Sequence, residues 1–187
     1  MLLLRDIFMS EVAPIPITEK LLTCKPEKVL LINPQSPIFP ENGSRFPYGL
    51  FCLTAYAADR FPEVQFQILD LQLEEPGFNV GQFLATEKPD LTMVTAVTPY
   101  EPYAQDIGQI HRTTLSDKVS WIGGYHPTVM PEETMLERNF DMVGIGESEE
   151  TFGELLKLWI AGEAKNLGQV NGIGYHDALG KLIKTSP

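Results

Sequence analysis

A glycine pair followed by an aromatic residue and a histidine is the part of this sequence best suited to binding chemistry. Gly123 and Gly124 end the β-rich run 118–122, and Tyr125 and His126 follow directly. Two residues without side chains at the end of a strand allow a ligand or another segment to approach the backbone closely. A tight strand-to-helix turn would use the same glycines, so the rest of the sequence has to decide between these two interpretations.

The composition is that of an ordinary globular domain. The 187 residues are 43% hydrophobic and 21% charged, which predicts one main domain with a sizeable core. The net charge of −11 disfavours nucleic acid and anionic membranes as partners. The first apolar run breaks at Arg5, too early for a signal peptide or a membrane span. Cys24 and Cys52 lack metal-ligand spacing, and free thiols predict a cytoplasmic protein.

Strand and helix patterns alternate from Lys28 onwards. The expected strands are 29–32, 64–69, 91–96, 118–122 and 140–145, and the expected helices are 48–60, 78–86, 101–115, one opened by Thr128 or Met130 and one with Ser148 as its N-cap. This alternation predicts an α/β, flavodoxin-like (Rossmann-like) fold with a doubly wound, five-stranded parallel sheet in the order 2-1-3-4-5. Residues 165–187 predict a C-terminal β-hairpin with its turn near Gly180.

This strand order brings four loops to one edge of the sheet, beyond the carboxyl ends of the strands, where ligands of such folds bind. The loops are 33–47, 97–102, the turn at the glycine pair, and 146–149. They are rich in glycine, proline and aromatic residues but contain no catalytic triad, acid pair or metal-ligand cluster. They therefore predict a binding face for a large flat ligand, with no catalytic residues.

The usual ligands of this fold class do not match the loops. A dinucleotide site requires Gly-x-Gly-x-x-Gly after the first strand, where this chain has Asn33, Pro34 and Gln35. The same stretch lacks the Ser/Thr-rich phosphate loop of a flavodoxin. A phosphoacceptor receiver requires an aspartate after the third strand, where Thr95 and Ala96 stand.

A set of ordered motifs resembles the N-terminal cobalamin-binding domain of radical S-adenosylmethionine enzymes, in the subgroup of the anaerobic magnesium-protoporphyrin monomethyl ester cyclases and many methylases. The motifs are Thr95-x-Val97-Thr98-Pro99, Gly123-Gly124-Tyr125-His126-Pro127-Thr128, Pro131-Glu132-Glu133 and Gly144-Ile145-Gly146-Glu147-Ser148-Glu149-Glu150-Thr151. Each motif is weak alone, and their order and spacing are what make the resemblance specific. The resemblance covers about Lys28 to Lys184.

The resemblance implies a cobalamin site on the four loops. Cobalamin-binding domains of this fold often carry Asp-x-His-x-x-Gly after the first strand, and its histidine ligates cobalt. The matching stretch 33–38 has neither that histidine nor that glycine, so base-off cobalamin without a protein histidine ligand is expected. The implied cofactor-binding residues are Asn33, Gln35, Thr95, Val97, Thr98, Gly123, Gly124, Tyr125, His126, Gly146 and Glu147.

Several finer expectations follow. Gly124→Val is expected to fill the cleft and block cobalamin while the fold stays intact. The loop 35–47 is expected to become ordered when cobalamin binds. His126 is expected to be a cleft residue, whereas His111 and His176 are expected at the surface.

The resemblance also implies how the chain is organised. Residues 1–27 form an N-terminal extension, 28–164 the cobalamin-binding domain, and 165–187 the hairpin that leads to a radical S-adenosylmethionine domain. The iron–sulfur cluster and S-adenosylmethionine belong to that catalytic domain in cis, because the three-cysteine loop for the cluster is not in this sequence. The chain is then either a fragment of a longer enzyme or a free-standing corrinoid module.

On this interpretation the chain holds the corrinoid for a methyl-transfer or cyclase-type reaction and catalyses nothing alone. The alternative is an interaction or regulatory domain of the same fold that binds no corrinoid. The oligomeric state is not predicted.

Overall fold

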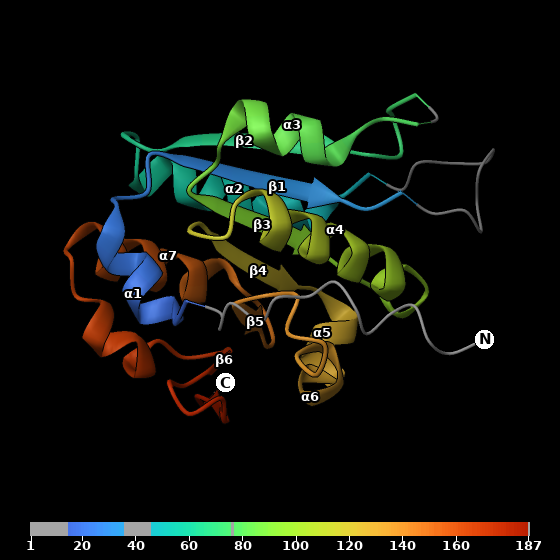
Figure 1. Ribbon diagram of the computed structural model, residues 1–187. Helices are drawn as coiled ribbons and strands as arrows, with labels where there is room; N and C mark the ends of the chain where they lie inside the picture. Colours follow the sequence, from blue (N-terminus) through green and yellow to red (C-terminus); the bar gives the residue numbers. More distant parts are fainter. Residues whose placement is uncertain (1–14, 36–45, 76, 187) are drawn as a thin grey trace.

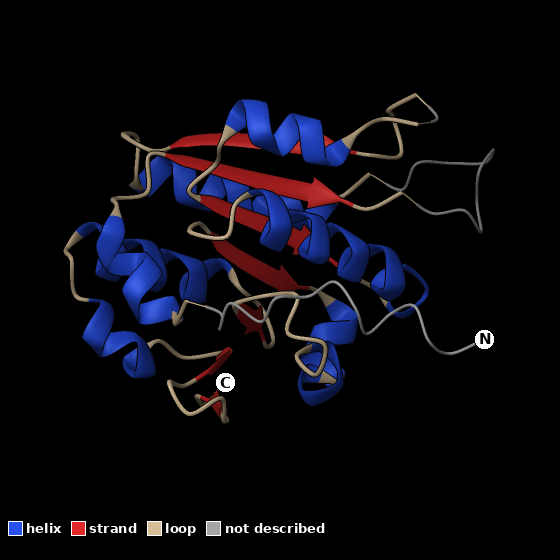
Figure 2. Ribbon diagram, viewed as in Figure 1, coloured by secondary structure: helices blue, strands red, loops and turns tan. Residues whose placement is uncertain are grey.

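The computed structural model describes residues 15–35, 46–75 and 77–186 (Figure 1). A central sheet is covered by helices on both faces (Figure 2), as the alternation of strands and helices predicts. Most of the loop 35–47, which was expected to become ordered with ligand, lies outside the described residues. No helix in the described ranges is both long and apolar enough to span a membrane.

The sheet has seven strands in the order β2-β1-β3-β4-β5-β6-β7. The strands are β1 (Lys28–Asn33), β2 (Gln65–Asp70), β3 (Leu91–Thr95), β4 (Val119–Gly123), β5 (Met142–Gly144), β6 (Ile173–His176) and β7 (Leu182–Lys184). Neighbouring strands from β2 to β5 are parallel, which confirms the predicted fold and the order 2-1-3-4-5. The predicted hairpin is also present, but β6 pairs with β5 in antiparallel orientation and extends the five-stranded sheet to seven.

The helices cover the two faces of the sheet as two separate core clusters. The helices are α1 (Ile17–Thr23), α2 (Tyr48–Arg60), α3 (Val80–Glu87), α4 (Glu101–Thr114), α5 (Tyr125–Val129), α6 (Pro131–Thr134) and α7 (Glu149–Ile160), with short 3-10 turns η1 (Thr98–Tyr100) and η2 (Ala164–Gln169). One face packs against α1, α2 and α7, and the other against α3 and α4. Successive residues of β1 point to opposite faces, so Val29 and Leu31 enter the first cluster whereas Leu30 and Ile32 enter the second.

The segment after the glycine pair differs from the prediction. A helix was expected to begin at Thr128 or Met130, and α6 does begin behind Met130. An additional short helix, α5, starts directly after Gly124, which occupies its N-cap position. It was missed because the prediction treated the glycine pair as a turn and placed the helix start at Thr128 or Met130, next to Pro131, whereas glycine also serves as an N-cap.

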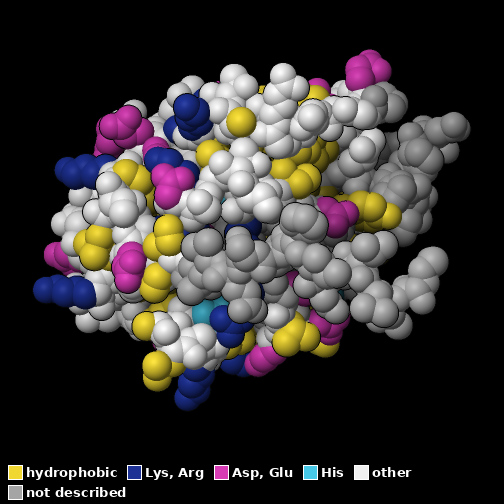
Figure 3. Space-filling view, viewed as in Figure 1, with side chains coloured by type: hydrophobic (Ala, Val, Ile, Leu, Met, Phe, Trp, Pro, Cys, Tyr) yellow, Lys and Arg dark blue, Asp and Glu magenta, His cyan; other side chains and the backbone are white. Residues whose placement is uncertain are grey.

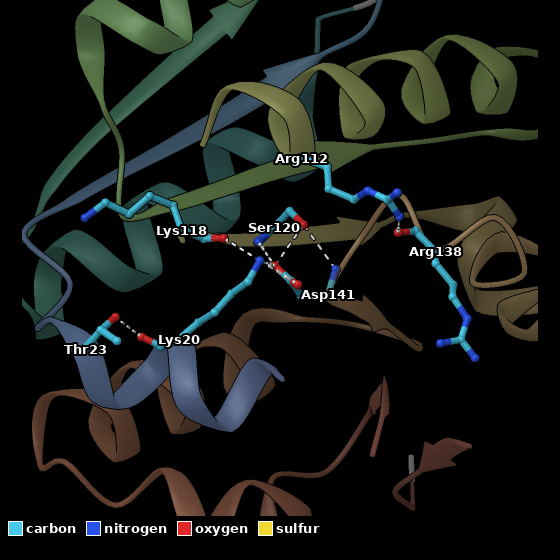
Figure 4. A network of polar contacts seen from close by, with 7 residues as sticks. All are labelled: Lys20, Thr23, Arg112, Lys118, Ser120, Arg138 and Asp141. Atoms are coloured by element: carbon cyan, nitrogen blue, oxygen red, sulfur yellow. Dashed lines mark hydrogen bonds and ion pairs between the residues drawn. The ribbon is translucent and has the colours of Figure 1, made fainter. Parts of the chain in front are cut away.

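A buried ion pair holds the helix α1 against the amino ends of β4 and β5 (Figure 4). Lys20 Nζ lies 2.8 Å from a carboxylate oxygen of Asp141 and donates a 2.9 Å hydrogen bond to the carbonyl of Lys118. The same carboxylate accepts hydrogen bonds from the backbone N–H and the hydroxyl of Ser120. Ile17 and Leu21 of α1 are buried in the first core cluster, so this part of the N-terminal segment packs as an integral layer of the fold.

His111 is buried, although it was expected at the surface. It lies on the inward face of α4, one turn after Ile107, and its side chain is 1% exposed. Neither ring nitrogen has a hydrogen-bond partner within the described structure. Burial, reinforced by the nearby charge of Lys20, lowers the pKa of His111 from 6.5 to about 3. The residue is therefore a neutral core side chain at physiological pH.

The surface in Figure 3 shows acidic and basic side chains interspersed with apolar ones, without one large patch of either sign. Several apolar side chains nevertheless stay exposed at the carboxyl edge of the sheet. Tyr125 is 68% exposed there, and Val97, Val129 and Met130 also face solvent. This edge combines exposed apolar groups with the ends of the parallel strands.

Candidate functional site

A cavity of about 130 Å³ lies between the carboxyl ends of β3 and β4 and the first turns of α2 and α7. Its lining residues are Gly49, Leu50, Leu53, Met93, Val94, Thr95, Trp121, Gly123, Gly124, Gly146, Glu147, Ser148 and Glu149. Two larger hollows, of about 550 and 880 Å³, contain none of the residues predicted for the site. The small cavity is therefore the one that coincides with the sequence prediction.

The backbone conformation at position 124 requires a glycine, whereas the cavity does not. Its φ of +109° lies in a region that favours glycine. A Cβ atom at this position would lie 2.7 Å from the carbonyl oxygen of Ala96 and 3.0 Å from the hydroxyl of Thr95. The expectation that Gly124→Val fills the cleft without disturbing the fold is therefore wrong, because the side chain would collide with the backbone of the neighbouring strand end.

Gly123 is the member of the pair whose missing side chain leaves room in the cavity. A Cβ atom there would meet only the indole of Trp121, at 3.4 Å from Nε1, which is ordinary van der Waals contact. Thr95, directly opposite Gly123 in the β3–β4 register, also lines the cavity. The two glycines thus have different roles, one in the turn and one in the cavity wall.

Trp121 forms part of the cavity floor and was not predicted as a site residue. Its ring is 1% exposed and packs edge-on against Phe152, with centroids 5.9 Å apart. Its Nε1–H has no acceptor among the described residues. The signal that could have found it is strand alternation: Trp121 stands two residues before Gly123 and so points to the same face of the sheet.

The predicted residues separate into those that line the cavity and those that lie elsewhere at the sheet edge. Thr95, Gly123, Gly124, Gly146 and Glu147 line it together. Asn33, Gln35, Val97, Thr98, Tyr125 and His126 do not. The prediction missed the apolar part of the lining, which comes from the first turns of α2 and from β3.

Asn33 is hydrogen-bonded to the neighbouring strand β2. It is buried at the end of β1, and its side-chain amide donates a 2.8 Å hydrogen bond to Asp70 at the end of β2. Gln35 is exposed. The histidine position of the Asp-x-His-x-x-Gly motif is therefore occupied by the exposed amide of Gln35, and the aspartate position by an amide that is hydrogen-bonded within the protein.

His126 lies beside the cavity and not in its lining. Its Nδ1 is 3.3 Å from the hydroxyl of Thr98, and its Nε2 is buried with no partner in the described part of the chain. Thr128, two residues further, donates to the carbonyl of Gly124 and accepts from the N–H of Gly146. This hydroxyl ties the glycine-pair turn to the turn that precedes α7.

Ser148 occupies the N-cap of α7 as predicted, but its side chain does not cap the helix. The hydroxyl instead lies 3.5 Å from the carbonyl of Gly146 and faces the cavity. Glu149 and Glu150 in the first turn complement the positive end of the helix dipole. The helix start therefore contributes both a hydroxyl and negative charge to the cavity rim.

This arrangement suits binding better than catalysis. No group of three or more His, Cys, Asp or Glu side chains that could hold a metal ion occurs among the described residues. The cavity floor is apolar, and its rim consists of glycines together with the hydroxyl and carboxylate side chains at the start of α7. The site can take up a flat ring and let a chain of polar atoms pass along its glycines.

Fold and site define an α/β ligand-binding domain whose cleft opens at the carboxyl edge of a doubly wound sheet. Residues 43–156 match the model of the B12 binding domain family. The chain belongs to this family.

Similar proteins include two curated enzymes. The chain is 30% identical to cytidylyl-2-hydroxyethylphosphonate methyltransferase of Streptomyces wedmorensis, over 83% of this chain and 32% of that enzyme. It is 32% identical to anaerobic magnesium-protoporphyrin IX monomethyl ester cyclase of Rubrivivax gelatinosus, over 57% of this chain and 20% of that enzyme. The chain thus spans a third or less of the length of these relatives.

Solved structures share the fold. The radical S-adenosylmethionine methyltransferase TsrM from Kitasatospora setae, with cobalamin and a [4Fe-4S] cluster bound, superposes with a TM-score of 0.70 at 20% identity, over 87% of this chain and 29% of TsrM. The cobalamin-dependent radical enzyme OxsB with aqua-cobalamin bound also gives 0.70, at 22% identity, over 89% of this chain and 23% of OxsB.

Proposed function

We propose that this chain is the cobalamin-binding domain of a radical S-adenosylmethionine enzyme and that it takes the nucleotide tail of the corrinoid into the cavity at Gly123. The observation that carries the proposal is that Thr95, Gly123 and Gly124, the positions matching the family's motifs, line one cavity at the expected edge of the sheet. Membership of the B12 binding domain family supports the same ligand.

The cavity suits the lower end of a cobalamin tail in chemistry. An apolar cavity of about 150 Å³ holds benzene, and the cavity here, of about 130 Å³ with Leu50, Leu53 and Met93 in its lining, would have to widen for the larger lower base to enter. The aromatic lower base suits this apolar floor. The ribose and phosphate would then pass the glycines toward the exposed loops, where the backbone leaves room for them.

The residues present also favour base-off binding without a protein ligand to cobalt. Gln35, an exposed amide, stands at the histidine position of the Asp-x-His-x-x-Gly motif, and Asn33, at its aspartate position, is hydrogen-bonded to Asp70. His126 follows β4, on a different loop, and interacts with Thr98. A tail that extends into the cavity would remove its benzimidazole from the cobalt, and the sequence of the loop after β1, residues 34–47, contains no histidine to replace it.

The domain would hold the cofactor for a reaction performed elsewhere. Bound cobalamin supplies cobalt chemistry for methyl transfer or a cyclase-type oxidation, and a radical S-adenosylmethionine domain in cis would supply the iron–sulfur cluster and S-adenosylmethionine. In this organisation residues 28–164 bind the corrinoid and the hairpin within 165–187 leads to the catalytic domain. Cys24 and Cys52 are free thiols, which fits a reducing cytoplasm.

Equilibrium dialysis of the purified chain tests this proposal. Hydroxocobalamin should be retained, whereas cobinamide, a corrinoid without the nucleotide tail, should bind at least about tenfold more weakly because the cavity stays unfilled. Retention of neither corrinoid by the folded chain would contradict the proposal and favour the alternative, an interaction or regulatory domain of the same fold. Equal retention of both corrinoids would show that the nucleotide tail does not bind in the cavity.

A further inference from the structure

The indole N–H of Trp121 is a buried donor without an acceptor, at the floor of the cavity. Nε1 has no hydrogen-bond partner among the described residues, and the side chain is almost fully buried. Leaving a buried donor unsatisfied costs about 1–3 kcal/mol. Such a donor in a native fold requires an explanation, and an acceptor on a ligand in the cavity would supply one.

The surrounding residues hold the ring in this orientation. Phe152 meets it edge-on at 90°, and Gly144 leaves just enough space for it, because a Cβ there would lie 2.6 Å from Nε1. A Cβ built on Gly123, which lines the cavity, would lie 3.4 Å from Nε1. The N–H edge of Trp121 is thus framed by two glycines, of which Gly123 lines the cavity.

The position of Trp121 along β4 indicates which part of a ligand it meets. Its Cα lies about 6–7 Å deeper along the strand than that of Gly123, and the indole reaches back so that Nε1 lies 3.4 Å from the Cβ position of Gly123. The deepest part of an inserted nucleotide tail is its lower base. In the base-off state the ring nitrogen that would otherwise bind cobalt is a free acceptor, and burying it without a donor is unfavourable.

We propose that Trp121 donates a hydrogen bond from Nε1 to the ring nitrogen of the lower base, and that it thereby selects corrinoids whose base carries such a nitrogen. This inference rests on the proposed function, since it requires that the tail occupies the cavity. Corrinoids with a phenolic lower base have no ring nitrogen and would leave the indole N–H unsatisfied. The domain would therefore discriminate among corrinoids by their lower base.

Ser148 is the other polar group near this ring. Its hydroxyl and Nε1 both lie close to the Cβ position of Gly144, at 3.1 and 2.6 Å. The hydroxyl is directed to the carbonyl of Gly146 at 3.5 Å, and no hydrogen bond joins it to the indole. A purely structural pairing of Trp121 with Ser148 would leave corrinoid selectivity unchanged when the indole is removed.

The test compares two ligands on the wild-type chain and on Trp121→Phe. Binding of cobalamin and of a corrinoid with a p-cresol lower base is measured by equilibrium dialysis, and the cobalamin affinity is referred to the base-off fraction of free cobalamin. On that scale wild type should bind cobalamin about three- to tenfold more tightly than the phenolic corrinoid, which is base-off already, and Trp121→Phe should abolish that preference. Trp159→Phe is the matched control, because the Nε1–H of Trp159 is satisfied by the carbonyl of Cys24 at 2.7 Å; it should keep the preference.

The outcomes distinguish a failure of the proposed function from a failure of the Trp121 hydrogen bond. Wild type that binds neither corrinoid would refute the proposed function itself. Wild type that binds both corrinoids equally would overturn the role of Trp121 alone, and this comparison decides the matter even if Trp121→Phe does not fold. A preference that survives in folded Trp121→Phe would overturn it as well.

Discussion

A methyl group added to Gly124 should destabilise the fold, whereas the same group added to Gly123 should not. At Gly124 an alanine would be held at φ +109°, which costs about 1–3 kcal/mol. Its Cβ would also lie 2.7 Å from the carbonyl oxygen of Ala96, and relieving such overpacking costs about 1–3 kcal/mol more. Together these are about 2–6 kcal/mol, a large part of the 5–15 kcal/mol typical of a domain.

Gly123→Ala should change the free energy of unfolding by less than about 0.5 kcal/mol, because its Cβ enters open cavity space beside Trp121. Urea denaturation followed by circular dichroism measures both variants, and the melting temperature of Gly124→Ala should fall by roughly 5–20 °C. Equal stability of the two alanine variants would refute this assignment of roles to the glycine pair.

The larger substitution Gly123→Val tests ligand binding in addition to stability. Its branched side chain would occupy much of the cavity, so the cobalamin affinity should fall at least about tenfold while the melting temperature stays near that of wild type. Equilibrium dialysis with hydroxocobalamin provides the measurement. Unchanged affinity in the folded variant would show that the ligand does not enter the cavity.

Three further predictions concern stability. The folded pKa of His111 is lowered from 6.5 to about 3, so as the pH falls the unfolded chain takes up a proton before the folded chain does. The free energy of unfolding should therefore decrease as the pH falls from 6.5 towards 3, by up to about 1.4 kcal/mol per pH unit. In urea titrations His111→Leu should reduce that slope, and an unchanged slope would contradict the assignment. Lys20→Met should cost about 3 kcal/mol at pH 7 because Asp141 loses its buried partner, and a cost below 1 kcal/mol would show the pair to be unimportant. Ser148→Ala should cost less than about 0.5 kcal/mol, since its hydroxyl does not cap α7; a loss above 1 kcal/mol would indicate a cap in solution.

The fold could be predicted because its strands carry two unambiguous signals. The run Val29 to Ile32 is continuously apolar, and β1 is buried on both faces; the spacing of the helical segments then selects parallel crossovers. The pairing of β6 with β5 could not be read in the same way. Hydrophobic alternation identifies a hairpin, but it does not specify which edge of a sheet the hairpin joins.

The site was predicted where backbone chemistry dominates and missed where packing does. Glycines at strand ends are visible in the sequence, and Gly123, Gly124 and Gly146 do line the cavity. Leu50 and Leu53 look like any core residues of an amphipathic helix, because their role depends on a gap in packing that no linear pattern encodes. His111 was misplaced for a related reason, since a polar residue one turn from Ile107 was assigned to the surface by its chemistry and not by its helical position.

Electron paramagnetic resonance of the chain loaded with cob(II)alamin tests the central claim most directly. If the tail occupies the cavity and Gln35 stands at the histidine position of the motif, the cobalt would have no axial nitrogen, so its hyperfine lines should show no triplet splitting. A clear triplet would contradict this account. If that triplet vanished in His126→Ala, His126 would be the axial ligand, and if it persisted, the benzimidazole would still be bound to cobalt and the cavity would not hold the tail.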